Sequence, residues 1–281
     1  MCKFLAFFCL LNLLSCSRKS DPSGTEKFDP VPVKLPLNPQ LAEISGIASA
    51  ESKPGIIWGI EDSGNPSQLS VIGQDAQVKG TIVLKGITNR DWEEIDVANG
   101  SVYIAETGDN GLQYADYSIY KFIEPSDTED TVHSIERIRF NYPDGSHDCE
   151  AMIVDPSSGD VYFFTKSTSG TKVYKLAFPY SVTTVHTLTY LGQLNLYSVV
   201  AASLSFDQKE IILKTYTTLY YYAKSNSENI FQAVSKPPEI LPYVLEPQGE
   251  AVSFAKDNSG YFTLSEKGFG AEVWLYYYKR K

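Results

Sequence analysis

Glu93-Glu-Ile-Asp-Val97, Glu150-Ala-Met-Ile-Val154 and Glu250-Ala-Val-Ser-Phe254 are three versions of one short pattern, an acidic residue followed by an apolar strand. Ser45-Gly-Ile-Ala-Ser49 and Ala202-Ser-Leu-Ser-Phe206 hold the same place in two further repeats. The five starting residues are 48, 57, 52 and 48 positions apart. A regular interval of about fifty residues is typical of a repeat architecture.

Each repeat contains four strand-like runs separated by turn signals such as Asn-Gly. In the second repeat they cover 93–98, 102–107, 118–124 and 135–142, and in the third 150–154, 160–166, 172–178 and 186–192. No stretch has a persuasive helical period. The sequence therefore predicts an all-β protein, a five-bladed β-propeller with four-stranded antiparallel blades. A six-bladed propeller is the alternative, because one divergent repeat is easily miscounted.

The two ends of the chain predict how the ring closes. The last repeat has only three runs, 250–255, 260–265 and 271–279, while residues 31–37 form an apolar run before the first repeat. An N-terminal strand that completes the last blade would leave no exposed sheet edge at the closure. We expect a single propeller domain over residues 28–281.

The composition excludes two classes of protein. The 281 residues are 43% hydrophobic and 21% charged, which excludes a largely disordered chain. The 34 acidic residues outnumber the 24 basic ones and give a net charge of −10, which argues against nucleic-acid binding.

The N-terminus has the pattern of an export signal. Residues 1–15 hold one charge, Lys3, and an apolar run that is too short to span a bilayer. This run ends in Leu13-Leu14-Ser15-Cys16, which resembles the lipobox of bacterial lipoproteins. We expect residues 1–15 to be a lipoprotein signal peptide, Cys16 to carry lipid and residues 16–27 to be a flexible tether. The protein would then be anchored in the bacterial cell envelope, at the outer membrane; an ordinary signal peptide is the alternative.

Repeat register predicts an acidic cluster on the axis. The start of an inner strand and the end of the strand that returns beside it lie at the same end of a blade. Oxygen donors gathered there favour a hard cation, with Ca²⁺ first and Mg²⁺ second. The expected metal ligands are Ser45, Glu93, Glu150 and Glu250. The expected residues for binding a small anionic or glycan ligand are Glu61, Asp62, Asp91, Glu106, Lys166, Lys214 and Glu266.

A structural role is the alternative for these acidic residues, since carboxylates that open strands also cap backbone amides of neighbouring blades. His147 and Asp148, which open the third blade, are the candidates for activating water. No motif of a serine hydrolase, zinc protease or phosphate-binding loop occurs.

Several short sequence segments together resemble those of uncharacterised bacterial lipoprotein propellers of the broad NHL-like and phytase-like group. These segments are Ser45-Gly-Ile-Ala48, Trp58-Gly-Ile-Glu-Asp-Ser-Gly-Asn65, Asp91-Trp-Glu93, Gly108-Asp-Asn110, Asp148-Cys-Glu-Ala151 and Gly249-Glu-Ala251. The acidic inner-strand starts are also similar, more loosely, to calcium-activated nucleotidases (apyrases), which are five-bladed propellers with Ca²⁺ on the axis.

These features favour a membrane-anchored binding propeller that holds a divalent cation and an anionic or glycan ligand. Two enzymatic alternatives remain open. One is a metal-dependent hydrolase of phosphorylated substrates. The other is a glycoside hydrolase that uses paired axial carboxylates.

Overall fold

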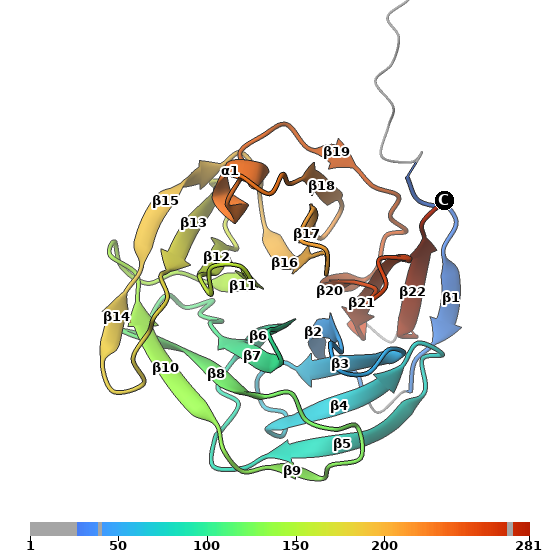
Figure 1. Ribbon diagram of the computed structural model, residues 1–281, viewed down its shortest axis with the longest axis horizontal. Coiled ribbons are helices and arrows are strands. Elements are labelled where there is room, and N and C mark those ends of the chain that lie inside the picture. The colour runs from blue at the N-terminus through green and yellow to red at the C-terminus, as the bar shows by residue number, and fades with distance from the viewer. Residues whose placement is uncertain (1–26, 39–40, 269–271) are drawn as a thin grey trace, which may run out of the picture.

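Five small β-sheets form a ring around a central axis (Figure 1). The computed structural model describes residues 27–38, 41–268 and 272–281. The predicted five-bladed all-β propeller is confirmed, and the six-bladed alternative is wrong. The predicted signal peptide, Cys16 and residues 16–26 of the predicted tether lie outside the described residues.

Each blade is built outward from an inner strand that lies next to the axis (Figure 1). The inner strands are β2 (Ile44–Ser49), β6 (Trp92–Ala98), β11 (Cys149–Val154), β16 (Val199–Leu204) and β20 (Gln248–Phe254). The second strands are β3 (Ile56–Glu61), β7 (Ser101–Glu106), β12 (Val161–Thr165), β17 (Glu210–Thr215) and β21 (Gly260–Glu266). The third strands are β4 (Gln68–Gly73), β8 (Tyr117–Ile123), β13 (Thr171–Leu176), β18 (Leu219–Ala223) and β22 (Trp274–Lys279).

The outer strands are less regular than predicted. They are β5 (Val78–Leu84), β10 (Glu136–Asn141), β15 (Thr189–Leu194), the short β19 (Glu239–Ile240) and β1 (Val33–Pro36). The predicted run 186–192 is divided, because β14 (Val185–Thr187) joins β10 of the second blade in a parallel pair. In the same way β9 (Thr131–Val132) pairs with β5 of the first blade. Each of these strands covers the open edge of the preceding blade.

One helical turn interrupts the strands. The helix α1 (Ile230–Val234) starts at Asn229 with a capping box and packs three buried side chains onto the fourth blade. Its five residues are too few to show a helical period in the sequence. No helix in the described ranges is long and apolar enough to cross a membrane.

The ring closes where the sequence predicted. Strand β1 pairs antiparallel with β22, which places the N-terminal segment beside the C-terminal strand (Figure 1). Before it, Phe28 forms an isolated bridge with Arg280 and packs edge-on against Tyr261 at 4.9 Å between ring centroids. Its side chain is fully buried.

Apolar side chains fill the wedges between neighbouring blades. The wedge between the first and second blades contains Trp58 and Trp92, and both are fully buried. Packing of this kind holds the inner strands side by side, so equivalent positions of different blades come together at the axis.

Replacement of Phe28 by alanine should destabilise the closed ring. Loss of a fully buried phenylalanine costs about 3–5 kcal/mol, and here it weakens the N-terminal segment that pairs with the C-terminal strand. Urea unfolding of the mature domain measures the effect. Val31→Ala is the matched control, because Val31 lies in the same segment and is 79% exposed; equal stability losses in both variants would contradict the closure role.

Candidate metal site

A β-bulge stands at the same place in all five inner strands. In β6, Trp92 pairs with Glu106 and Glu94 with Ala105, so the ladder passes over Glu93. Such a bulge turns a side chain away from the regular alternation of a strand. The residues passed over are Ser45, Glu93, Glu150 and Val200, and Gly249 with Glu250 in the last blade.

This register corrects one prediction. In the fourth blade the residue equivalent to Glu93 is Val200, not Ala202, because the bulge lies between Val199 and Ala201. The other four predicted starting residues are equivalent to one another in the structure.

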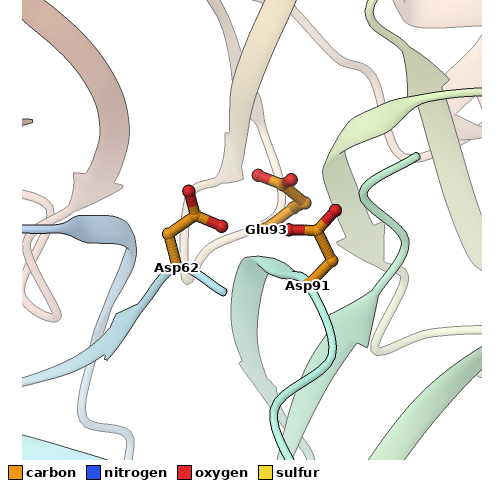
Figure 2. Close-up of side chains that lie close together, drawn as sticks. All are labelled: Asp62, Asp91 and Glu93. Carbon is orange, nitrogen blue, oxygen red and sulfur yellow. The ribbon is translucent and has the colours of Figure 1, made fainter. Parts of the chain in front are cut away.

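Five carboxylates gather beside these bulges, and we call them the acidic cluster. Asp62 follows β3 of the first blade, Asp91 and Glu93 belong to the second blade, and Asp148 and Glu150 to the third. Figure 2 shows the carboxylates of Asp62, Asp91 and Glu93 converging from two neighbouring blades. Their ligand oxygens lie within 4.8 Å of one another, and the same limit holds for Glu93, Asp148 and Glu150.

Gly108 makes room for this arrangement. A Cβ atom on residue 108 would lie 2.2 Å from Glu93 Oε1 and 2.5 Å from Asp91 Oδ2. Both distances are far below van der Waals contact, so any other residue would force the two carboxylates to move. Gly108-Asp109-Asn110 is typical of a turn in the sequence, and its spatial role appears only in the structure.

Hydrogen bonds neutralise little of the charge in the acidic cluster. Among the described residues, no hydrogen-bond donor reaches Glu93, although its side chain is buried. Lys166 forms an ion pair with Oε1 of Glu150, while Oε2 of Glu150 is buried without a partner among the described residues. Buried acceptors usually have partners, so the unpartnered Oε2 of Glu150 has the surroundings expected of a metal ligand, and the buried Glu93 side chain beside it also receives no hydrogen bond among the described residues.

The pKa values of carboxyl groups in the acidic cluster also fit a cation site. Burial, followed by the charges of Glu150 and the three aspartates, raises the pKa of Glu93 well above its ordinary value. Burial and the neighbouring Asp62 raise the pKa of Asp91 to about 7. Like charges this close disfavour ionisation, and a bound cation removes that penalty.

Glu250 and Glu266 form a second acidic pair beside the cluster. Burial, followed by the charges of Glu250 and Asp62, raises the pKa of Glu266 to about 8. Tyr216 donates a hydrogen bond to Glu250 Oε1 at 2.6 Å, and Gln248 donates to Glu266 Oε2 at 3.0 Å. Neither glutamate belongs to a group of three or more carboxylates close enough to share an ion within the described chain.

The two predicted lysines have different surroundings. The side chain of Lys166 is 22% exposed beside Glu150. Lys214 is fully buried, and its Nζ contacts Glu246 Oε2 at 3.0 Å and Tyr243 Oη at 2.6 Å. Burial lowers the pKa of Lys214 despite the neighbouring Glu246. We therefore remove Lys214 from the candidate anion-binding residues, because its ammonium group is enclosed.

Three other predicted residues make structural contacts. The Ser45 hydroxyl donates to the Trp92 carbonyl oxygen at 2.7 Å and so links the first two blades. Glu106 accepts hydrogen bonds from Tyr120 and from the Arg90 backbone. Burial raises the pKa of Glu61, although backbone amides near Glu43 partly oppose this effect.

The predicted catalytic pair is divided between two places. Asp148 belongs to the acidic cluster and accepts a hydrogen bond from the Asp109 amide at 2.8 Å. The His147 ring lies among Asp144, Tyr142 and Tyr174, with its Nε2 3.0 Å from Asp144 Oδ1 and 2.8 Å from Tyr174 Oη. The structure thus gives His147 partners other than the acidic cluster, and its role as a base stays a prediction.

Sequence reasoning missed Glu94. Its fully buried carboxylate accepts hydrogen bonds from the backbone of Ile95 and, at 2.9 Å, from Ala202 of the fourth blade. Asp96 similarly accepts from Val154 of the third blade. These two acids have the structural role that was the alternative for the whole set. Side chains alternate between the two faces of a strand, so Glu94 and Asp96 share one face and Glu93 belongs to the other. This alternation could have separated them from Glu93 in the sequence.

No family model and no curated protein sequence matches the chain. A solved structure of a luciferin-regenerating enzyme is similar in fold, with a TM-score of 0.51 and 11% identity over 88% of this chain and 95% of that one. A nidogen/laminin complex gives a TM-score of 0.49 and 11% identity over 86% of this chain and 83% of that one. The first likeness supports the propeller fold and nothing finer.

The stability of the metal-free protein should fall as the pH rises. Asp91 and Glu266, with pKa values of about 7 and about 8, hold their protons more tightly when folded than in the unfolded chain, where carboxyls titrate near pH 4. Their contribution is therefore complete below about pH 4 and lost as the pH passes through 7 to 8. In chelator, the melting temperature at pH 9 should be lower than at pH 6.

Any divalent cation that these carboxylates hold should reverse this trend, with Ca²⁺ the first to test, because the carboxylates must lose their protons to bind an ion. The gain in melting temperature from added Ca²⁺ is expected to be larger at pH 9 than at pH 6. A melting temperature in chelator that is the same at both pH values would contradict the raised pKa values.

Proposed function

We propose that this protein is a lipid-anchored propeller of the bacterial cell envelope that binds a divalent cation, Ca²⁺ in the first place, at the acidic cluster. The observation that carries the proposal is the set of five converging carboxylates, in which Oε2 of Glu150 is buried without a partner and the buried Glu93 side chain receives no hydrogen bond among the described residues. A cation at this position stabilises the fold by neutralising charges that burial otherwise opposes.

The donor set favours calcium. Carboxylate oxygens make up the whole cluster, and neither His147 nor Cys149 takes part in it. Hard cations prefer oxygen ligands, and Ca²⁺ accepts six to eight of them in irregular geometry, whereas Mg²⁺ requires a near-ideal octahedron. Carboxylates that come from three separate blades suit Ca²⁺, because this ion tolerates irregular geometry.

The cation also supports binding of a small anionic or glycan ligand. Asp62 and Asp91 are half-buried, so an ion held by them faces solvent and keeps positions for outside oxygens. Lys166 supplies a partly exposed positive charge at the same end of the ring. A phosphate, carboxylate or sugar hydroxyl would meet both charges there.

The N-terminal sequence supports the anchored location. Residues 1–15 have the charge and apolar run of a signal peptide, and Leu13-Leu14-Ser15-Cys16 resembles a lipobox. In the described part of the chain, contacts with the ring begin at Lys27 and Phe28, so residues 17–26 are the segment that would separate the propeller from a membrane.

Calcium should raise the thermal stability of the mature domain. Binding to the native state at a hundred times the dissociation constant contributes about 2.7 kcal/mol, which corresponds to a rise of roughly 5–10 °C for a domain of this size. Scanning calorimetry with Ca²⁺ and with chelator measures the rise, and Glu150→Gln should abolish most of it.

Glu43→Gln is the matched control, since Glu43 is exposed next to the acidic cluster but is not one of its members. This variant should retain the full calcium effect. No rise in the unmodified domain, or an undiminished rise in Glu150→Gln, would refute calcium binding at the acidic cluster.

Cys16→Ser should release the protein from the membrane. Without the thiol no lipid can be attached, and a signal peptide alone gives a soluble exported domain. Fractionation of bacteria that express the full chain, followed by intact mass measurement, tests this outcome with Ser17→Ala as control. A Cys16→Ser protein that still sediments with membranes would contradict the lipid anchor.

A further inference from the structure

The acidic cluster is made of two triads that share Glu93. The first contains Asp62, Asp91 and Glu93, and the second contains Glu93, Asp148 and Glu150. Ligand oxygens lie within 4.8 Å of one another inside each triad, but no group within this limit contains both Asp62 and Asp148. The five carboxylates therefore offer two positions for an ion.

Each triad has the dimensions of a cation site. Calcium binds oxygen at about 2.3–2.6 Å, so two oxygens on one ion are at most about 5 Å apart. Both triads satisfy this limit, whereas the complete set of five carboxylates does not form one group within it. Figure 2 shows the carboxylate of Glu93 beside those of Asp62 and Asp91, and the same residue is also a member of the second triad.

The propeller repeat explains why there are two positions. In the first triad, an acid from the first blade meets the Asp91-Trp-Glu93 unit of the second. In the second triad, Glu93 meets the Asp148-Cys-Glu150 unit of the third blade. The Asp-x-Glu unit of the second position is thus related to that of the first by a shift of one blade, whereas the third acid comes from the end of β3 in the first triad and from an inner-strand bulge in the second. The series stops at the fourth blade, where the bulge carries Val200.

Unpartnered buried oxygens point independently to ligands. Oε2 of Glu150 is buried and has no hydrogen-bond partner within the described ranges, and the residue is 3% exposed. Glu93, which is 6% exposed, also has no donor among the described residues. Gly108 leaves open the space beside Glu93 and Asp91 that any side chain would fill. Each triad thus contains at least one carboxylate that the protein itself leaves unsatisfied.

The charges also balance with two ions. The five carboxylates contact one ammonium group among the described residues, that of Lys166. Fully ionised, they retain four negative charges, which two divalent cations neutralise. From these observations we infer that the site holds two divalent cations bridged by Glu93, an inference that rests on the proposed function.

The two ions have different surroundings. The ion between Glu93, Asp148 and Glu150 is held by three buried residues and stabilises the axis. The ion between Asp62, Asp91 and Glu93 has two half-buried ligands and faces solvent. The outer ion is therefore the one that takes water or the oxygen of an anionic ligand.

Counting the ions on the unmodified mature domain tests the inference without any variant. After equilibration with Ca²⁺ and removal of free metal, elemental analysis should find two ions per chain, and titration calorimetry should fit the same number. One ion per chain would overturn the bridged pair but leave the proposed function standing. No bound ion would overturn both.

Variants then assign the two positions. Asp62→Asn should leave one ion, that of the inner triad, and Asp148→Asn should leave only the outer ion. Glu93→Gln should lose both, and the change is nearly isosteric, so the fold should remain intact by circular dichroism. Glu43→Gln should keep two. Loss of both ions in Asp62→Asn and in Asp148→Asn would show a single shared position and overturn the inference.

Paramagnetic resonance with Mn²⁺ in place of Ca²⁺ checks the bridge directly. Two Mn²⁺ ions that share the Glu93 carboxylate should give a spin-coupled spectrum, which becomes that of an isolated ion in Asp62→Asn. Two uncoupled ions in the unmodified domain would exclude a shared ligand.

Discussion

Closure of the ring is the constraint on which the rest of this structure depends. A single blade is a small sheet with two open edges, and it buries its faces only against the blades on either side. The pairing of β1 with β22 completes the fifth blade and brings the two ends of the chain together. Once five blades are packed side by side, their inner strands must converge, and residues that are fifty or more positions apart become neighbours.

Convergence of the inner strands brings buried carboxylates close together, and the structure accommodates their charges in two ways. Glu94 and Asp96 are stabilised by backbone amides of other blades, so they act as structural links across and beside the axis. Glu93 directly precedes them in the sequence but lies on the bulge, where the ladder offers no amide. The same strand therefore contains two carboxylates that the fold satisfies and one, Glu93, for which the described residues provide no hydrogen-bond donor. This contrast separates the candidate metal ligands from the structural acids.

Two glycines leave the space that charged side chains near the axis occupy. Gly108 leaves space for Glu93 and Asp91, and a Cβ on Gly249 would lie 2.4 Å from Glu246 Oε2 and 2.8 Å from Lys214 Nζ. Gly108 precedes Asp109-Asn110 in a turn, and Gly249 directly precedes Glu250. In each case the absent side chain leaves space for a cluster of charged groups, so these glycines allow close packing as well as a turn.

The sequence by itself determined the all-β architecture, the five repeats and the N-terminal closing strand, because hydrophobic alternation and turn residues are local signals. It also indicated Glu93, Glu150 and the Asp-x-Glu units, since these recur in register. Only the tertiary structure decided which acids lie close enough to share an ion. The bulges, the exclusion of Ser45 and Glu250 from the triads, the burial of Lys214 and the space beside Gly108 all depend on distances between blades, and no local pattern of residues specifies such distances.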